Sequence, residues 1–203
     1  YFALRFSNGV ENSAFRYAAA EDCTGSFNST FGSNAMLVTT TANYSCAFGR
    51  QALYSLSTGS QNCAFGAFSL YNTTTASNNS AFGYETLYNN TTGAGNVAVG
   101  RGAGYNAGVL LQTNANCVFI GYQANTNANA LTNVIVIGYT AQGTASNQVT
   151  LGNAAITSTI LRGTVTLTTA SAHTLGGDLT TDRWLSSATN TLIGVGVAGA
   201  GTL

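Results

Sequence analysis

A parallel β-solenoid, in which short strands stack along a continuous coil, is the all-β fold class that the sequence predicts. Glycines recur at a constant interval, each follows an apolar residue, and the chain contains 24 glycines but no proline. A repeat of this kind indicates an architecture in which each unit buries apolar side chains against its neighbours. The missing prolines agree with this, since every coil keeps its backbone donors for the next coil.

Each repeat is marked by a short segment that ends in glycine. The segments read CAFG at 46–49, CAFG at 63–66, SAFG at 80–83 and VAVG at 97–100. Five successive units place their glycines at Gly32, Gly49, Gly66, Gly83 and Gly100. After an insertion, VFIG ends at Gly121, and IVIG ends at Gly138 with the regular interval restored. A sequence repeat corresponds to one structural unit, so we expect coils of about 17 residues over 12–152, with a glycine at each bend except the first, where Arg16 holds the position.

Two residue columns precede the glycines. The residue directly before the glycine is large and apolar, and the residue three before it is small or β-branched. Side chains two positions apart share one face of a strand, so we expect both columns to be buried between stacked coils. The first column supplies the expected structural ladder of Phe31, Phe48, Phe65 and Phe82. The alanines between the columns, such as Ala64, would then face outward and permit close approach of a neighbouring subunit.

A second apolar stretch follows each glycine. Leu53, Leu70 and Leu87 stand four residues after it, and a tyrosine follows each of them. A polar turn comes next, so each unit is expected to contain a strand, a glycine bend, a short second strand and a turn. Asparagine recurs four residues before the glycine, where its side chain can bond backbone groups of the turn.

Composition excludes several classes of function. Only 6% of residues are charged, against about 25% in a typical domain, and the formal net charge is zero. A neutral chain without lysine lacks the basic surface that nucleic-acid binding requires. No apolar run of about 18 residues is present, so we expect no membrane insertion. With 45% hydrophobic residues the chain can bury a core, which argues against disorder.

The stretch NSAFGYETLYNNTTGAGNVAVGRGAGY at 79–105 resembles the repeats of bacteriophage tail-fibre and neck-appendage proteins. It is also similar to the repeats of trimeric autotransporter adhesin heads, whose coils are usually shorter. NQVTLGNAAITSTILRGTV at 147–165 resembles the segment where such phage fibres leave the repeat region. The resemblance implies an intertwined or side-by-side homotrimeric fibre that contacts other fibre or virion subunits. It also implies a host-receptor-binding surface that recognises a cell-surface glycan or protein.

Catalytic motifs are weak, and we expect that the protein is not an enzyme and binds no cofactor or metal. His173 has Ser171 and Asp178 nearby in sequence, but hydroxyl residues are abundant throughout the chain, so the match carries little information. Glu21 and Asp22 are adjacent and would point apart, unlike the facing carboxylates of a glycosidase. The glycine-rich stretches at 93–104 and 194–201 lack the Gly-Lys-Ser/Thr of a phosphate loop.

Two further groups of residues are candidates for a role. Cys46 and Cys63 share one column, and we expect free thiols in the core, where a thiol behaves as a small hydrophobe. The tyrosines that follow the leucine column are Tyr54, Tyr71, Tyr88 and Tyr105. If exposed, this row is a candidate contact for a glycan or partner, and otherwise it packs between subunits.

The chain is thus expected to comprise a lead-in at 1–11, the solenoid at 12–152, a transition at 153–189 and a further repeat at 190–203. The expected function is a structural segment of a virion tail fibre that presents a receptor-binding surface. A bacterial cell-surface adhesin or extracellular filament is the alternative. An ice-binding solenoid is less favoured because the threonines drift between columns, and a polysaccharide depolymerase because no convincing carboxylate pair is present. A virion or extracellular location follows from either main alternative.

Overall fold

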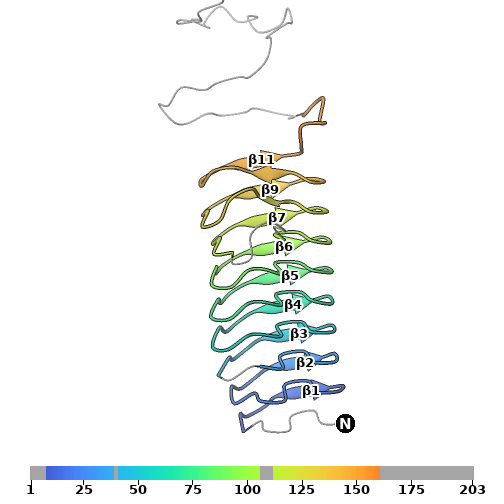
Figure 1. Cartoon of the computed structure of the whole chain (residues 1–203), viewed down its shortest axis with the longest axis vertical. Coiled ribbons are helices and arrows are strands. Elements are labelled where there is room, and N and C mark those ends of the chain that lie inside the picture. Colours follow the sequence, from blue (N-terminus) through green and yellow to red (C-terminus); the bar gives the residue numbers. More distant parts are fainter. Residues whose placement is uncertain (1–7, 39–40, 106–111, 161–203) are drawn as a thin grey trace, which may run out of the picture. The chain divides into compact units, whose positions relative to one another are not determined.

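The computed structural model describes residues 8–38, 41–105 and 112–160, and these residues form the predicted parallel β-solenoid (Figure 1). Most of its coils have the predicted 17 residues, because equivalent residues such as Cys46 and Cys63 pair directly in successive coils. The interval is 16 residues from Ser13 to Ser29, 21 from Val97 to Val118 and 14 from Ile135 to Val149. Apart from Ile160, the described residues belong to one compact unit, Tyr1–Thr159. None of them lies in a helix. The expected further repeat at 190–203 and most of the expected transition lie outside the described residues.

One three-residue strand from each coil joins a nine-stranded parallel sheet in the order β1-β2-β3-β4-β5-β6-β7-β9-β11. The strands are β1 (Ser13–Phe15), β2 (Ser29–Phe31), β3 (Cys46–Phe48), β4 (Cys63–Phe65), β5 (Ser80–Phe82), β6 (Val97–Val99), β7 (Val118–Ile120), β9 (Ile135–Ile137) and β11 (Val149–Leu151). Equivalent residues pair, so that Cys46, Ala47 and Phe48 of β3 lie beside Cys63, Ala64 and Phe65 of β4. The in-register columns read from the sequence are therefore confirmed.

The bend after each strand of the large sheet is formed by glycine except after β1, where Arg16 takes the position with φ 102°. Two features of these bends favour glycine. Gly66 has φ +138°, a conformation that residues with a side chain rarely adopt. A Cβ atom at Gly66 would also collide with the backbone carbonyl of Gly83 in the next coil. The same close approach recurs at Gly32, Gly49, Gly83 and Gly100. This column therefore sets both the direction of the chain and the distance between coils.

The expected second strand is wrong for most coils, because the segment after the glycine is a stack of turns. Leu53, Leu70 and Leu87 take left-handed φ values of 52°, 53° and 49°. Their backbones still bond the next coil, as when the Leu53 N–H donates to the Ser69 carbonyl at 3.0 Å. A left-handed non-glycine residue costs about 1–2 kcal/mol, which burying a leucine at about 1.5–3 kcal/mol offsets. Only β8 (Asn125–Thr126) and β10 (Gln142–Gly143) form strands in this half of a described coil.

The orientation expected for the main strands is also wrong. Ala47, Ala64 and Ala81 point into the coil and are fully buried, whereas the phenylalanines beside them face outward. In the coils of β3, β4 and β5, Leu53, Leu70 and Leu87 fill the narrow interior opposite these alanines. The buried core thus consists mainly of the alanine and leucine columns.

Packing in a later coil demonstrates this limit on volume. Gly104 replaces leucine in the leucine column, and Phe119 replaces alanine in the facing strand column. A Cβ atom added at Gly104 would come close to both Leu87 and Phe119. Phe119 of the following coil therefore fills space that a side chain at Gly104 would occupy.

Buried asparagines connect successive coils, as expected. The Asn79 side-chain oxygen accepts from the Asn96 N–H at 2.9 Å, and the Asn62 side-chain oxygen accepts from the Asn79 N–H at 3.1 Å. Asn62 also donates its amide to the Ala76 carbonyl at 2.8 Å. The asparagine column therefore supplies hydrogen bonds at the corner where the chain leaves the turn and enters the strand.

The inward position of the alanines can be tested with a matched pair of substitutions. Ala81→Val overfills the interior and is expected to lower the free energy of unfolding by about 1–3 kcal/mol. Ser80→Val places the same side chain on the outward face, beside Val97 in the paired strand, where no interior space has to expand, and should lower stability by less than Ala81→Val does. Urea unfolding followed by circular dichroism measures both. A larger loss for Ser80→Val would contradict the assigned orientation.

Candidate interaction surface

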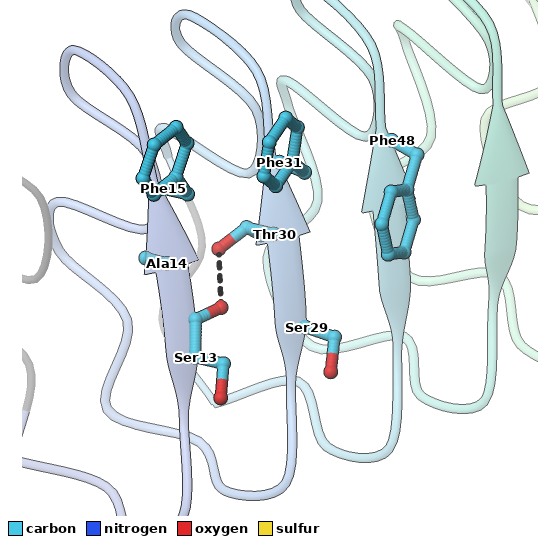
Figure 2. Close-up of a pocket in the computed structure, with 7 residues that line it drawn as sticks. All are labelled: Ser13, Ala14, Phe15, Ser29, Thr30, Phe31 and Phe48. Atoms are coloured by element: carbon cyan, nitrogen blue, oxygen red, sulfur yellow. Dashed lines mark hydrogen bonds between the residues drawn. The ribbon is translucent and has the colours of Figure 1, made fainter.

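The outward face of the nine-stranded sheet is an apolar surface, which we call the sheet face. It is built from two columns, the residue before each glycine and the residue three before it. In the first column, Phe15, Phe31, Phe48, Phe65, Phe82, Val99, Ile120, Ile137 and Leu151 each expose 37–58% of their surface. Figure 2 shows the start of this face, where Phe15, Phe31 and Phe48 line a shallow hollow with the small residues of neighbouring positions.

The phenylalanines of the sheet face stack as a ladder. Ring centroids are 4.7 Å apart for Phe15 and Phe31, 6.1 Å for Phe31 and Phe48, and 4.8 Å for Phe48 and Phe65. The rings of Phe65 and Phe82 are 5.2 Å apart. The four phenylalanines of the expected structural ladder stack in this way, and they lie on the surface of the chain.

Charge is absent from this surface. None of the eleven strands in the described part of the chain contains Asp, Glu, Lys or Arg. The smaller column is also uncharged and runs from Ser13 through Cys46 and Cys63 to Val97 and Val149. A contiguous exposed apolar surface without charged residues is typical of a site that another molecule covers.

The tyrosine row lies after the glycine bend and is half-buried. Tyr54 and Tyr71 stack with centroids 5.0 Å apart, and Tyr71 and Tyr88 stack at 4.9 Å. Tyr105 breaks the row by meeting Tyr88 edge-on at 5.5 Å. Burial, reinforced by the neighbouring tyrosines, raises the pKa of Tyr88. Stacking covers the ring faces between neighbours, so the row presents mainly ring edges and hydroxyl groups.

Arginines cover aromatic rings beside the tyrosine row, an arrangement that the sequence analysis missed. The Arg50 guanidinium lies 5.2 Å from the Phe68 ring centroid, and Arg101 lies 5.7 Å from that of Tyr84. Arg101 also contacts the Tyr122 ring at 5.5 Å and donates to its hydroxyl at 3.2 Å. The sequence does contain a sign of this arrangement. Arg50, Tyr84, Arg101 and Tyr122 all directly follow a bend glycine, so they occupy equivalent positions in their coils.

The four cysteines divide into two environments. Cys46 and Cys63 are free thiols, as expected, but they lie half-buried on the sheet face and not in the core. Cys23 and Cys117 are free and completely buried, and burial raises the pKa of both thiols. Burial is also the main cause of the raised pKa of Cys63, and its contact with Cys46 adds to the effect.

The other sequence candidates provide no catalytic arrangement. His173, Ser171 and Asp178 lie outside the described residues. Within 8–38, 41–105 and 112–160, no three His, Cys, Asp or Glu side chains gather as a metal site. The glycines at 93–104 are explained by the repeat, since Gly95, Gly102 and Gly104 occupy left-handed positions with φ of 65–72°. A search of the described residues finds no helix able to cross a membrane.

Comparison with known proteins identifies no protein related to this chain. No protein-family model matches the chain, and no curated protein or solved structure is significantly similar to it. The sheet face and the tyrosine row are the two surfaces of the described residues with features suited to binding another molecule.

Proposed function

We propose that this chain is a structural segment of an extracellular fibre, of the virion tail-fibre kind, in which several copies associate through the sheet face. The observation that carries the proposal is the row of outward Phe, Val, Ile and Leu side chains on an uncharged solenoid. A bacterial surface adhesin would use the same surface in the same way. In either case the role is mechanical and adhesive, not catalytic.

The size of the sheet face supports an associated state. A fully exposed aromatic side chain offers about 150–250 Å², so the five phenylalanines together expose roughly 300–550 Å². That range already matches the largest apolar patch of a typical monomer, about 300–600 Å². The aliphatic residues of four more strands extend the face toward the roughly 800 Å² that each partner buries in a standard interface.

The repeat favours a second copy of this chain as the partner. Strands in a sheet lie about 4.8 Å apart, so the side chains of the sheet face recur at that interval. A parallel copy has the same interval and can interdigitate along the whole face, whereas a partner with another spacing falls out of register. The absence of charge removes both repulsion between copies and the cost of burying unpaired ions. Three copies about one long axis form the assembly that the resemblance to phage fibres implies.

The mass of the native protein tests this association. Light scattering coupled to size exclusion is expected to give about three times the 20.7 kDa chain mass. Phe65→Glu places a charge in the middle of the sheet face and should shift the mass toward that of one chain, because an unpaired charge would be buried between copies. Gln61→Glu adds the same charge in an exposed turn and should leave the mass unchanged.

Circular dichroism checks that both variants keep the strand content of the parent chain. A native protein that is monomeric at all concentrations would contradict the proposal. An assembly that Phe65→Glu leaves intact would show that the copies meet elsewhere.

Receptor contact is the second part of the proposal, and it assigns the tyrosine row to a host glycan. Ring edges and hydroxyls are available at Tyr54, Tyr71 and Tyr88, so recognition is expected to depend on hydrogen bonds from the phenols more than on stacking of sugar rings. The adjacent Arg50 and Arg101 add hydrogen-bond donors to the same side of the coil.

Glycan binding should therefore fall when a tyrosine hydroxyl is removed. Tyr71→Phe keeps the ring ladder and deletes one hydroxyl, and Tyr71→Ala deletes both ring and hydroxyl. Binding to an array of bacterial-surface polysaccharides should weaken for both variants, while Gln61→Ala in the exposed turn serves as the control. Full binding by Tyr71→Ala would exclude the tyrosine row as the glycan contact.

A further inference from the structure

The in-register thiols on the sheet face form a pair whose spacing suits a metal ion. Cys46 and Cys63 are direct partners in adjacent parallel strands, and both side chains point to the outward face. The contact between the two thiols contributes to the raised pKa of Cys63. The same column places Ser29 before the pair and Ser80 after it.

The distance between the strands distinguishes two kinds of chemistry. A disulfide needs Cβ atoms about 3.5–4.5 Å apart, whereas in-register side chains of neighbouring strands start about 4.8 Å apart. Bonds from sulfur to a d¹⁰ metal ion are about 2.3 Å long, so a linear sulfur–metal–sulfur unit spans about 4.6 Å. The pair therefore fits a bridging ion with less movement of the strands than a disulfide requires.

The nature of the ligands selects the ion. Two thiolates without imidazole or carboxylate partners favour a soft cation, such as Cu(I) and its thiophilic relatives. The described part of the chain places no third His, Cys, Asp or Glu with the pair, which leaves only two protein ligands. Two-coordinate linear geometry is common for Cu(I), Ag(I) and Hg(II), whereas structural Zn²⁺ sites use four ligands.

We propose that Cys46 and Cys63 together bind one soft, thiophilic cation of the Cu(I) class, which links two adjacent coils of the solenoid. Binding replaces two S–H protons by two sulfur–metal bonds and releases both protons, with no oxidation or reduction. The flanking Ser29 and Ser80 supply hydroxyl donors on either side of the resulting thiolates. All these groups come from one chain, so the site does not depend on association of copies.

Native mass spectrometry tests the site, with Cu(I) delivered under anaerobic conditions from a competing ligand to the reduced, chelator-treated chain as it refolds, before the sheet face is covered. One ion per chain is expected, whatever the number of chains in the assembly. Cys46→Ser and Cys63→Ser should each abolish binding at this stoichiometry. Cys23→Ser removes a thiol that is buried inside the coil and should retain the ion.

Two further measurements distinguish a specific two-cysteine site from nonspecific binding of the ion to thiols. Because two protons leave, apparent affinity should rise with pH, and the thermal midpoint of the loaded protein should exceed that of the apo protein. Retention of the ion by both Cys46→Ser and Cys63→Ser would overturn the proposal, as would a native Cys46–Cys63 disulfide. The count of ions per chain and the total mass are read from the same spectrum. Failure of the metal site is thereby distinguished from failure of the proposed association.

Discussion

Close contact between the backbones of successive coils is the constraint on which the rest of the structure depends. The bend glycines permit it, because a side chain at Gly66 would occupy the place of the Gly83 carbonyl. Once the coils are this close, each strand residue lies directly beside its equivalent in the next coil. Equivalent residues in successive coils then have similar surroundings, so similar residue types are favoured at each of these positions. This requirement produces the repeat in the sequence.

The narrowness of the coil decides which columns form the core. Its interior holds alanine from the strand and leucine from the opposite turn, so the phenylalanines remain outside. An ordinary domain would bury such residues within itself. Here they form a continuous exposed face, and the proposed association supplies the burial that a single chain lacks. The cysteine pair belongs to the same face because it lies two positions before the phenylalanines.

The repeat, the coil length, the parallel register and the bend glycines could all be predicted from the sequence, because each is a property of spacing. The inward and outward faces could not be assigned from spacing alone, since a period of two residues gives two faces without stating which is buried. Size was the missing signal: the uniform small residues at Ala47, Ala64, Ala81 and Ala98 mark the confined side. The left-handed leucines were also unpredictable, because local preference alone disfavours that conformation for leucine. Among the candidate contacts, the tyrosine row was predicted, but the arginines that cover its neighbouring rings were not.

Alkylation of the cysteines in the native, metal-free protein tests most directly whether copies cover the sheet face. Cys46 and Cys63 lie on that face, while Cys23 and Cys117 lie inside the coil and report its integrity. All four thiols are expected to resist iodoacetamide in the native assembly, and Phe65→Glu is expected to expose Cys46 and Cys63 alone. Rapid labelling of Cys46 and Cys63 in the native protein, with Cys23 and Cys117 still protected, would show an uncovered sheet face and contradict the account.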